Sequence, residues 1–352
     1  MSDSLYPLIT GRKIVEPIWG GRRLAVWLDL PPPRSVRLGE MWQAYDVNPV
    51  INGPLAGCSL ADLARAYGPD LVGQRSFARY GAEFPLLAKF IDAADRLSIQ
   101  VHPDDVYAYA HEADTGFHGK TEAWYILDAA PDADVIYGLT ATVDRATFAA
   151  AAHDGSLDDL LQRIPVTPGD VIFVPAGTVH AINAGIMLFE IQQKSDLTYR
   201  VYDYNRRDVK TGRLRELHLE KALDVSDFGP ARYGKAPTLN LSPGRDVLVA
   251  CPYFALERLT LDSEYCMHTD PASLEIITLI DGVGHLEWRE GTVPLRRGES
   301  IILPASLGAW SLVPRDAPIT ALRVYIPDMQ ALAVELSNHG YTADQIAATL
   351  RP

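Results

Sequence analysis

The chain has 352 residues, with 32 Lys and Arg against 45 Asp and Glu, which gives a formal charge of −13. An acidic chain of this kind lacks the basic surface that a general nucleic-acid-binding protein needs. No window approaches the roughly 18 uninterrupted apolar residues of a membrane-spanning helix, and the first residues lack the pattern of a signal peptide. We therefore expect a cytoplasmic protein without nucleic-acid or membrane partners, long enough for two domains.

Three cysteines, Cys58, Cys251 and Cys266, lie far apart and form no Cys-x-x-Cys pair. Neither a disulfide framework nor a thiolate zinc site is therefore expected. Any metal ion in this protein would be held by nitrogen and oxygen ligands.

Short apolar runs separated by 25 prolines and 26 glycines predict an antiparallel sandwich or barrel. In the first part of the chain, strands are predicted at residues 85–92, 97–102, 122–128, 134–138, 170–174, 187–193 and 198–203. Helical periodicity predicts a helix over 60–67 and two short helices within 144–164. We expect the latter pair to form a small helical insert beside a sheet.

An irregular stretch rich in Gly and Pro follows, and we interpret residues 229–245 as a linker. Strands are predicted beyond it at 254–261, 274–280, 284–288, 300–303 and 319–325, and helices at 328–337 and 342–350. The expected organisation is therefore a first domain over 1–228, a second over 246–327 and a helical tail over 328–352.

An internal repeat crosses this linker. Gly169-Asp-Val-Ile-Phe-Val-Pro-Ala-Gly-Thr-Val-His180 matches Gly298-Glu-Ser-Ile-Ile-Leu-Pro-Ala-Ser-Leu-Gly-Ala309 at an offset of 129 residues. The segment resembles the second motif of the cupin barrel. This resemblance implies a mainly β protein of two cupin-like, jelly-roll barrels with a few flanking helices. Because Ala309 replaces the histidine, the second barrel is expected to have no metal site.

Four residues of the first barrel form a candidate metal centre. Gln100 and His102 are two positions apart on a predicted strand, so their side chains point to the same face. Glu122 begins the next strand, and His180 follows the Pro-Ala-Gly turn. One amide oxygen, two imidazoles and one carboxylate suit a divalent ion, with Zn²⁺ favoured at one per chain.

Several segments resemble type I mannose-6-phosphate isomerase in its short bacterial form. They are Pro85-Leu-Leu-Ala-Lys-Phe-Ile-Asp-Ala, Leu97-Ser-Ile-Gln-Val-His-Pro-Asp-Asp105, Gly119-Lys-Thr-Glu122 and Gln193-Lys-Ser-Asp-Leu-Thr-Tyr-Arg200. The resemblance implies that Gln100, His102, Glu122 and His180 are the zinc ligands, and that Lys89, Ser98, Lys120, Arg200, Trp19 and Glu40 belong to the active site. One departure is Leu197, which stands where the family has Asn.

The implied reaction interconverts D-mannose 6-phosphate and D-fructose 6-phosphate by moving a proton between C1 and C2 through an enediol. A metal-assisted hydride shift is the alternative route. Lys120 or a metal-bound hydroxide would be the base, and the planar guanidinium of Arg200 suits a phosphate or an enediolate oxygen. Asp196 would orient Arg200 or assist ring opening, and Lys89 and Ser98 are candidates for phosphate contact. Arg206 and Arg207 are expected to lie in a solvated turn without a ligand.

Two other readings remain open from the sequence. One is a cupin metalloenzyme that acts on another sugar or sugar phosphate, or an oxygenase; an oxygenase would need a histidine-rich shell, which Gln100 disfavours. The other is a non-catalytic sugar-binding cupin, although no helix-turn-helix or basic patch supports a regulator. The sequence defines no oligomeric state.

Overall fold

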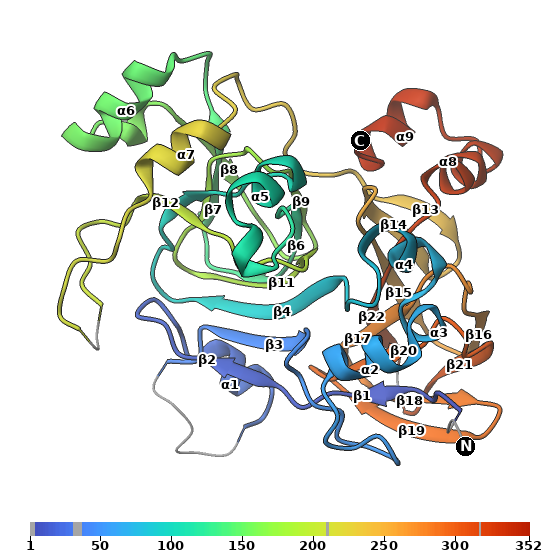
Figure 1. Cartoon of the computed structure of the whole chain (residues 1–352). Helices are drawn as coiled ribbons and strands as arrows, with labels where there is room; N and C mark the ends of the chain where they lie inside the picture. Colours follow the sequence, from blue (N-terminus) through green and yellow to red (C-terminus); the bar gives the residue numbers. More distant parts are fainter. Residues whose placement is uncertain (1–3, 31–36, 209–210, 317) are drawn as a thin grey trace. The chain divides into compact units, whose positions relative to one another are not determined.

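The structure is a computed structural model that describes residues 4–30, 37–208, 211–316 and 318–352 (Figure 1). The chain divides into two compact units. Unit 1 comprises the described parts of Met1–Lys13, Trp42–Ala88 and Ala236–Pro352, and unit 2 those of Ile14–Met41 and Lys89–Lys235. The mainly β fold predicted from the sequence is confirmed.

This division differs from a linear boundary at residue 228, and hydrogen bonds within unit 1 explain why. Strand β1 (Leu8–Ile9) pairs with β20 (Ser300–Leu303). The backbone N–H groups of Gln74 and Arg75 donate to the carbonyl oxygens of Pro271 and Ala272. Segments from the start of the chain therefore belong with its second half.

Unit 2 is built on two antiparallel sheets. The first has the order β2-β3-β4-β11-β6-β9 and the second β12-β5-β10-β7-β8. The strands are β2 (Lys13–Val15), β3 (Glu40–Ala44), β4 (Leu86–Ala93), β5 (Ile99–Val101), β6 (Glu122–Ala129), β7 (Asp134–Leu139), β8 (Leu161–Pro165), β9 (Val171–Val174), β10 (His180–Ile182), β11 (Ile186–Gln193) and β12 (Tyr199–Tyr202). Each of the strands β2, β3 and β4 has one end that is assigned to unit 1.

Alternating side chains divide the buried residues of unit 2 into two layers. Ile91, Trp124 and Tyr137 belong to an apolar cluster drawn from both sheets. Ile99, Val101 and their neighbours on the second sheet form another cluster with residues of α6 (Arg145–Asp154) and α7 (Leu219–Val225). The two helices thus cover one face of the second sheet, and the opposite face is the interior of the barrel.

Unit 1 repeats the two-sheet plan, with a seven-stranded sheet of order β1-β20-β17-β22-β15-β14-β13 and a four-stranded sheet of order β16-β21-β18-β19. Its other strands are β13 (Leu239–Ser242), β14 (Arg245–Ala250), β15 (Ala255–Leu261), β16 (Tyr265–His268), β17 (Glu275–Asp281), β18 (Val283–Trp288), β19 (Gly291–Arg296), β21 (Ala309–Pro314) and β22 (Ile319–Tyr325). The helices α8 (Met329–Asn338) and α9 (Ala343–Thr349) pack on β13 and β14 through a separate apolar cluster.

The remaining helices are short. They are α1 (Arg23–Trp27), α2 (Leu60–Tyr67), α3 (Pro69–Val72), α4 (Gln74–Tyr80), α5 (Asp105–His111) and the 3₁₀ turns η1 (Ala113–Thr115) and η2 (Leu157–Asp159). Helix α2 has the predicted bounds, and Ser59 caps its first turn. Among the described residues, no helix is long and apolar enough to span a membrane.

Two local predictions were wrong in part. Within 144–164 the chain forms α6 and η2 as expected, but Leu161–Pro165 is strand β8, because it pairs with β7. Within the predicted linker, Leu239–Ser242 is strand β13, in which Leu239 and Leu241 are buried and alternate with polar positions. In both cases tertiary pairing overrides a local signal.

The strand registers extend the internal repeat beyond the sequence match. Strands β9 and β20 are related by the offset of 129, and the partners β6 and β17 place Glu122 and Glu275 at equivalent positions. The next strands place Glu190 and Arg323 at equivalent positions. Ala309 pairs with His268 as His180 pairs with Gln100.

In unit 1 an arginine binds the carboxylate of Glu275, the residue equivalent to Glu122. Arg323 binds both oxygens of Glu275, with Nε–Oε2 and Nη2–Oε1 distances of 2.7 and 2.8 Å. Its Nη1 donates to Glu257 over 3.0 Å, and Glu257 also accepts from Arg245 and Tyr325. The Arg323 and Glu275 side chains are 7% and 1% exposed, so this is a buried ion-pair network.

We expect Arg323→Met to destabilise unit 1 by about 3 to 5 kcal/mol, because Glu275 would be left as a buried charge without its counter-ion. Urea unfolding followed by circular dichroism measures the change. Arg315→Met is the matched control, since that side chain is 71% exposed and its ion pair with Asp316 is 3.6 Å long; its effect should stay within about 0.5 kcal/mol. Equal unfolding curves for the two variants would contradict the role of Arg323 as the stabilising counter-ion of Glu275.

Candidate metal centre and active site

The four predicted metal ligands come together in the interior of the unit 2 barrel. Gln100 and His180 are register partners on β5 and β10. Their neighbours Ile99 and Ala181 belong to the cluster under α6 and α7, so the two side chains point to the opposite face. Glu122 lies two residues before Trp124, which is an interior residue. Donor atoms of His102, Glu122 and His180 all lie within 4.8 Å of one another, and all three residues are buried.

Backbone carbonyls fix the orientation of both histidines. Nδ1 of His102 lies 2.7 Å from the carbonyl oxygen of Leu197, and Nδ1 of His180 lies 2.8 Å from that of Thr178. Because a carbonyl oxygen only accepts, the proton sits on Nδ1 and leaves the Nε2 lone pair free in each ring. The Nε2 atoms lie 3.5 and 3.3 Å from the Glu122 carboxylate.

Burial keeps both rings neutral. It lowers the pKa of His180 to about 4 despite the hydrogen bond to Thr178, and the charge of Lys120 acts in the same direction. Burial, together with the Lys120 charge, also lowers the pKa of His102 well below its ordinary value. Neutral imidazole is the form that binds a metal ion.

Gln100 lies beside the cluster, with its amide nitrogen toward His180. Its Nε2 is 3.3 Å from Nε2 of His180, and its Oε1 accepts from the Ser98 hydroxyl over 3.4 Å. The position fits the predicted ligand, but a half-turn of the amide is needed to bring the oxygen to the place of the nitrogen. Ser98 is buried and serves here as a neighbour of Gln100.

Lys120 is the predicted catalytic residue nearest to these ligands. Its side chain is 5% exposed, and its Nζ lies 3.0 Å from Oε2 of Glu122 and 3.1 Å from Nε2 of His102. The Lys120 Nζ is therefore placed directly against the donor atoms of the candidate centre.

Arg200 lies next to Gln100 in the register of β12 and β5. Its guanidinium makes no hydrogen bond or ion pair with the described residues, and its Nε is buried without a partner. Burial, followed by the charge of Arg215, lowers the pKa of Arg200, while Asp203 and Asp196 act in the opposite direction. Asp196 is exposed and influences Arg200 through its charge.

Lys89 is held between two carboxylates. Its Nζ lies 3.1 Å from Glu190 and 3.3 Å from Glu40, and its side chain is 8% exposed. Burial alone would lower the pKa of Lys89, but Glu190 and Glu40 outweigh it and raise the pKa. The predicted residue Glu40 is thus an ion-pair partner of the predicted residue Lys89.

Sequence reasoning missed Glu190. It accepts from the Trp124 indole over 3.1 Å, and burial together with the charge of Glu122 raises its pKa. A signal was present, because Glu190 is the one charged residue in the eight-residue, fully buried strand Ile186–Gln193. A charge in such a strand needs a partner or a function.

Trp19 and Arg206 are both more buried than the sequence analysis expected. Trp19 is 5% exposed and packs in the interior cluster with Ile91 and Trp124, so it presents little surface to a ligand. Arg206, expected in a solvated turn, has a side chain that is 14% exposed. It donates to the Asp203 carboxylate and to the carbonyl oxygen of Arg96, which anchor it.

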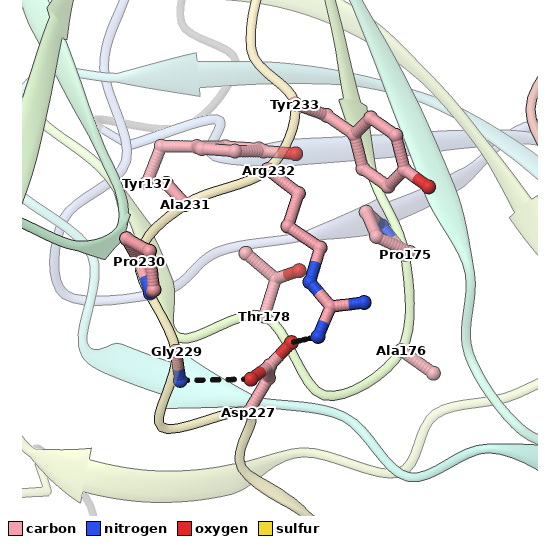
Figure 2. Close-up of a pocket in the computed structure, with 11 residues that line it drawn as sticks. Tyr137, Pro175, Ala176, Thr178, Asp227, Gly229, Pro230, Ala231, Arg232 and Tyr233 are labelled. Carbon is pink, nitrogen blue, oxygen red and sulfur yellow. Dashed lines mark hydrogen bonds and ion pairs between the residues drawn. The ribbon is translucent and has the colours of Figure 1, made fainter. Parts of the chain in front are cut away.

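Figure 2 shows a separate pocket of about 180 Å³ around Tyr137, Thr178 and Tyr233. An ion pair joins Arg232 to Asp227, and Asp227 also accepts from the backbone of Gly229. None of the site residues predicted from the sequence, all within the described ranges, lines this pocket. Its volume is also below the roughly 300 Å³ of a typical small-molecule site.

Comparisons with known proteins give the chain its family. Residues 12–128 match the catalytic domain of phosphomannose isomerase type I, and residues 245–315 match the cupin domain of mannose-6-phosphate isomerase. The chain is 39% identical to mannose-6-phosphate isomerase ManA of Bacillus subtilis, over 87% of this chain and 95% of that protein. It is 36% identical to mannose-6-phosphate isomerase of Streptococcus mutans, over 86% and 94%.

A solved structure agrees with these matches. The crystal structure of the mannose 6-phosphate isomerase from Bacillus subtilis superposes with a TM-score of 0.80 at 34% identity, over 91% of this chain and 99% of that one. Structures of phosphomannose isomerase from Salmonella typhimurium share the fold at 16% identity and a TM-score of 0.74. The sequence resemblance is confirmed, and the chain belongs to the type I mannose-6-phosphate isomerase family.

Proposed function

We propose that this protein is a zinc-dependent aldose–ketose isomerase that interconverts D-mannose 6-phosphate and D-fructose 6-phosphate. The observation that carries the proposal is the buried group of His102, Glu122 and His180, with Lys120 against it, in a chain of this family. The relatives at 39% and 36% identity are themselves named mannose-6-phosphate isomerases. A metabolic enzyme of this kind would act in the cytoplasm.

The donor set fits a zinc ion. Two neutral imidazoles and a carboxylate are common zinc ligands, and Gln100 would add an amide oxygen. The hydrogen bonds from each Nδ1 to a carbonyl oxygen are typical of metal-binding histidines. When bound, zinc would supply Lewis acidity for the oxygens at C1 and C2 of the sugar.

Lys120 is the residue we assign to proton transfer. Its buried Nζ lies within 3.1 Å of two of the proposed ligands, so a sugar bound at this centre would bring C1 and C2 near this atom. Asp196 would keep its supporting role through its charge on Arg200.

Arg200 is better suited than Lys89 to the phosphate. The charge of Lys89 is already balanced by Glu190 and Glu40, whereas the Arg200 guanidinium has no carboxylate partner among the described residues. A planar guanidinium can donate two parallel hydrogen bonds to a phosphate. Lys89 would then hold Glu40 and Glu190 in place, with Ser98 and Trp19 shaping the site around them.

We expect isomerisation, measured by a coupled assay, to be lost with a chelator and restored by zinc. His102→Ala should lower bound zinc from about one per chain to about a tenth or less, because it removes one of the ligands. His285→Ala is the control, since this histidine of unit 1 is partly exposed and bonds Glu287. A zinc-loaded protein without activity on any hexose 6-phosphate would refute the function.

We expect Arg200→Lys to reduce kcat/KM for mannose 6-phosphate by about 100-fold, because a paired guanidinium–phosphate contact is lost. Turnover of unphosphorylated mannose should stay low and change little. Arg207→Lys, in a neighbouring turn where Arg207 donates to the carbonyl oxygen of Gly212, is the control and should behave as the wild type. Equal losses on both sugars would instead assign Arg200 to an enediolate oxygen.

A further inference from the structure

The segment that carries Lys120 is held at three consecutive backbone N–H groups. Gly119 donates to Oδ1 of Asp105, Lys120 to the carbonyl oxygen of Pro103, and Thr121 to Oε1 of Gln193, each over 2.9 Å. Two of the three acceptors are side chains from elsewhere in the chain. The position of Lys120 therefore depends on residues outside its own strand.

Asp105 and Gln193 are themselves joined. Oδ1 of Asp105 accepts from Nε2 of Gln193 over 2.9 Å, in addition to the bond from Gly119. Gln193 is 1% exposed, and its backbone N–H donates to the carbonyl oxygen of Thr121 over 3.2 Å. The start of α5, the end of β11 and the segment before β6 are thus tied through one carboxylate oxygen and one amide.

Close packing leaves the segment little freedom. A Cβ atom on Gly119 would lie 2.4 Å from backbone atoms of Asp104 and Asp105. A glycine is needed here so that the chain can pass directly over the first residues of α5. The backbone before Lys120 is therefore fixed by contact as well as by hydrogen bonds.

We propose that Asp105, acting with Gln193, is a positioning residue that places Lys120 against His102 and Glu122. This rests on the proposed function, in which Lys120 transfers the proton. Catalytic groups must be held within a fraction of an ångström, and a misplacement of about 1 Å can cost about 100-fold in rate. Without Asp105, the Gly119 N–H would lose its acceptor and the link between Gln193 and this segment through Oδ1 would be lost, so the segment would shift to find another acceptor.

The neighbouring Asp104 provides a matched control. Its Oδ1 accepts from the backbone of Tyr107 over 2.8 Å and caps α5. It makes no side-chain bond to the segment 119–121 in the described structure. Asp104→Ala therefore weakens the same helix without removing the link to Lys120.

The test measures kcat, KM, bound zinc and Tm for the full chain. Asp105→Ala should lower kcat by about 30- to 100-fold, with KM changed by less than about 3-fold and bound zinc unchanged. Asp105→Asn keeps an acceptor oxygen and should retain at least about a third of wild-type kcat. Asp104→Ala should lower Tm and leave kcat unchanged.

A second variant covers the case in which Asp105→Ala does not fold. Gln193→Glu keeps the size of the side chain but places a carboxylate oxygen against Asp105, and it should lower kcat in the same way. Adding Asp105→Asn to Gln193→Glu removes the repulsion between like charges and should restore most of kcat. Failure of this rescue would overturn the proposal.

The remaining outcomes separate this proposal from the function on which it rests. Wild-type kcat in Asp105→Ala, or loss of zinc from that variant, would overturn the positioning of Lys120. Full activity in Lys120→Met would instead show that the assigned role of Lys120 is wrong, whatever the Asp105 variants do. Inactive Lys120→Met together with slow, zinc-loaded Asp105→Ala is the result we expect.

Discussion

A carboxylate buried at the start of a central strand is the constraint that shapes both barrels. Glu122 on β6 and Glu275 on β17 occupy equivalent positions in the two sheets, and each is 1% exposed. An ionised carboxylate in such a place costs several kcal/mol unless a cation or hydrogen-bond donors compensate it. Both units therefore contain a buried carboxylate whose charge must be compensated, and different residues compensate it in each unit.

In unit 1 an arginine of the same barrel compensates the charge of Glu275. Arg323 donates hydrogen bonds to both oxygens of Glu275 and to Glu257, so both carboxylate oxygens of Glu275 are already bonded to the guanidinium. With Ala309 at the position equivalent to His180, the described part of unit 1 lacks the histidine that the candidate centre of unit 2 uses. In unit 2 the equivalent of Arg323 is the acidic Glu190, and Glu122 faces two neutral histidines and a lysine. That arrangement leaves donor atoms available for a metal ion and a substrate.

The sequence predicted the strands whose apolar runs are long, and it predicted that the four candidate ligands lie together in the first barrel. Gln100 and His102 could be placed on one face because side chains alternate along a β-strand. His180 could be assigned to the same barrel as Glu122 because it ends the repeated Gly169–His180 motif. Strand β8 could not be predicted, since only its pairing with β7 defines it. Strand β13 pairs with β14 and lies in a stretch rich in Gly and Pro, which obscured the alternation of Leu239 and Leu241. The pairing of Lys89 with Glu190 and Glu40 was equally out of reach, because it joins three strands distant in the chain.

The buried charges also change how the site attracts its substrate. Lys89, Lys120 and Arg200 suggest a strongly positive pocket when counted from the sequence alone. The structure adds Glu190 and places the predicted residue Glu40 against Lys89, so that with Glu122 three carboxylates balance the three cations. Under the proposed function, attraction for a dianionic phosphate comes from the divalent ion and from the Arg200 guanidinium, which has no ion-pair partner among the described residues, and not from a general excess of positive charge. Selectivity for phosphorylated sugars therefore depends on the placement of a few charges, in a chain whose net charge of −13 would otherwise repel them.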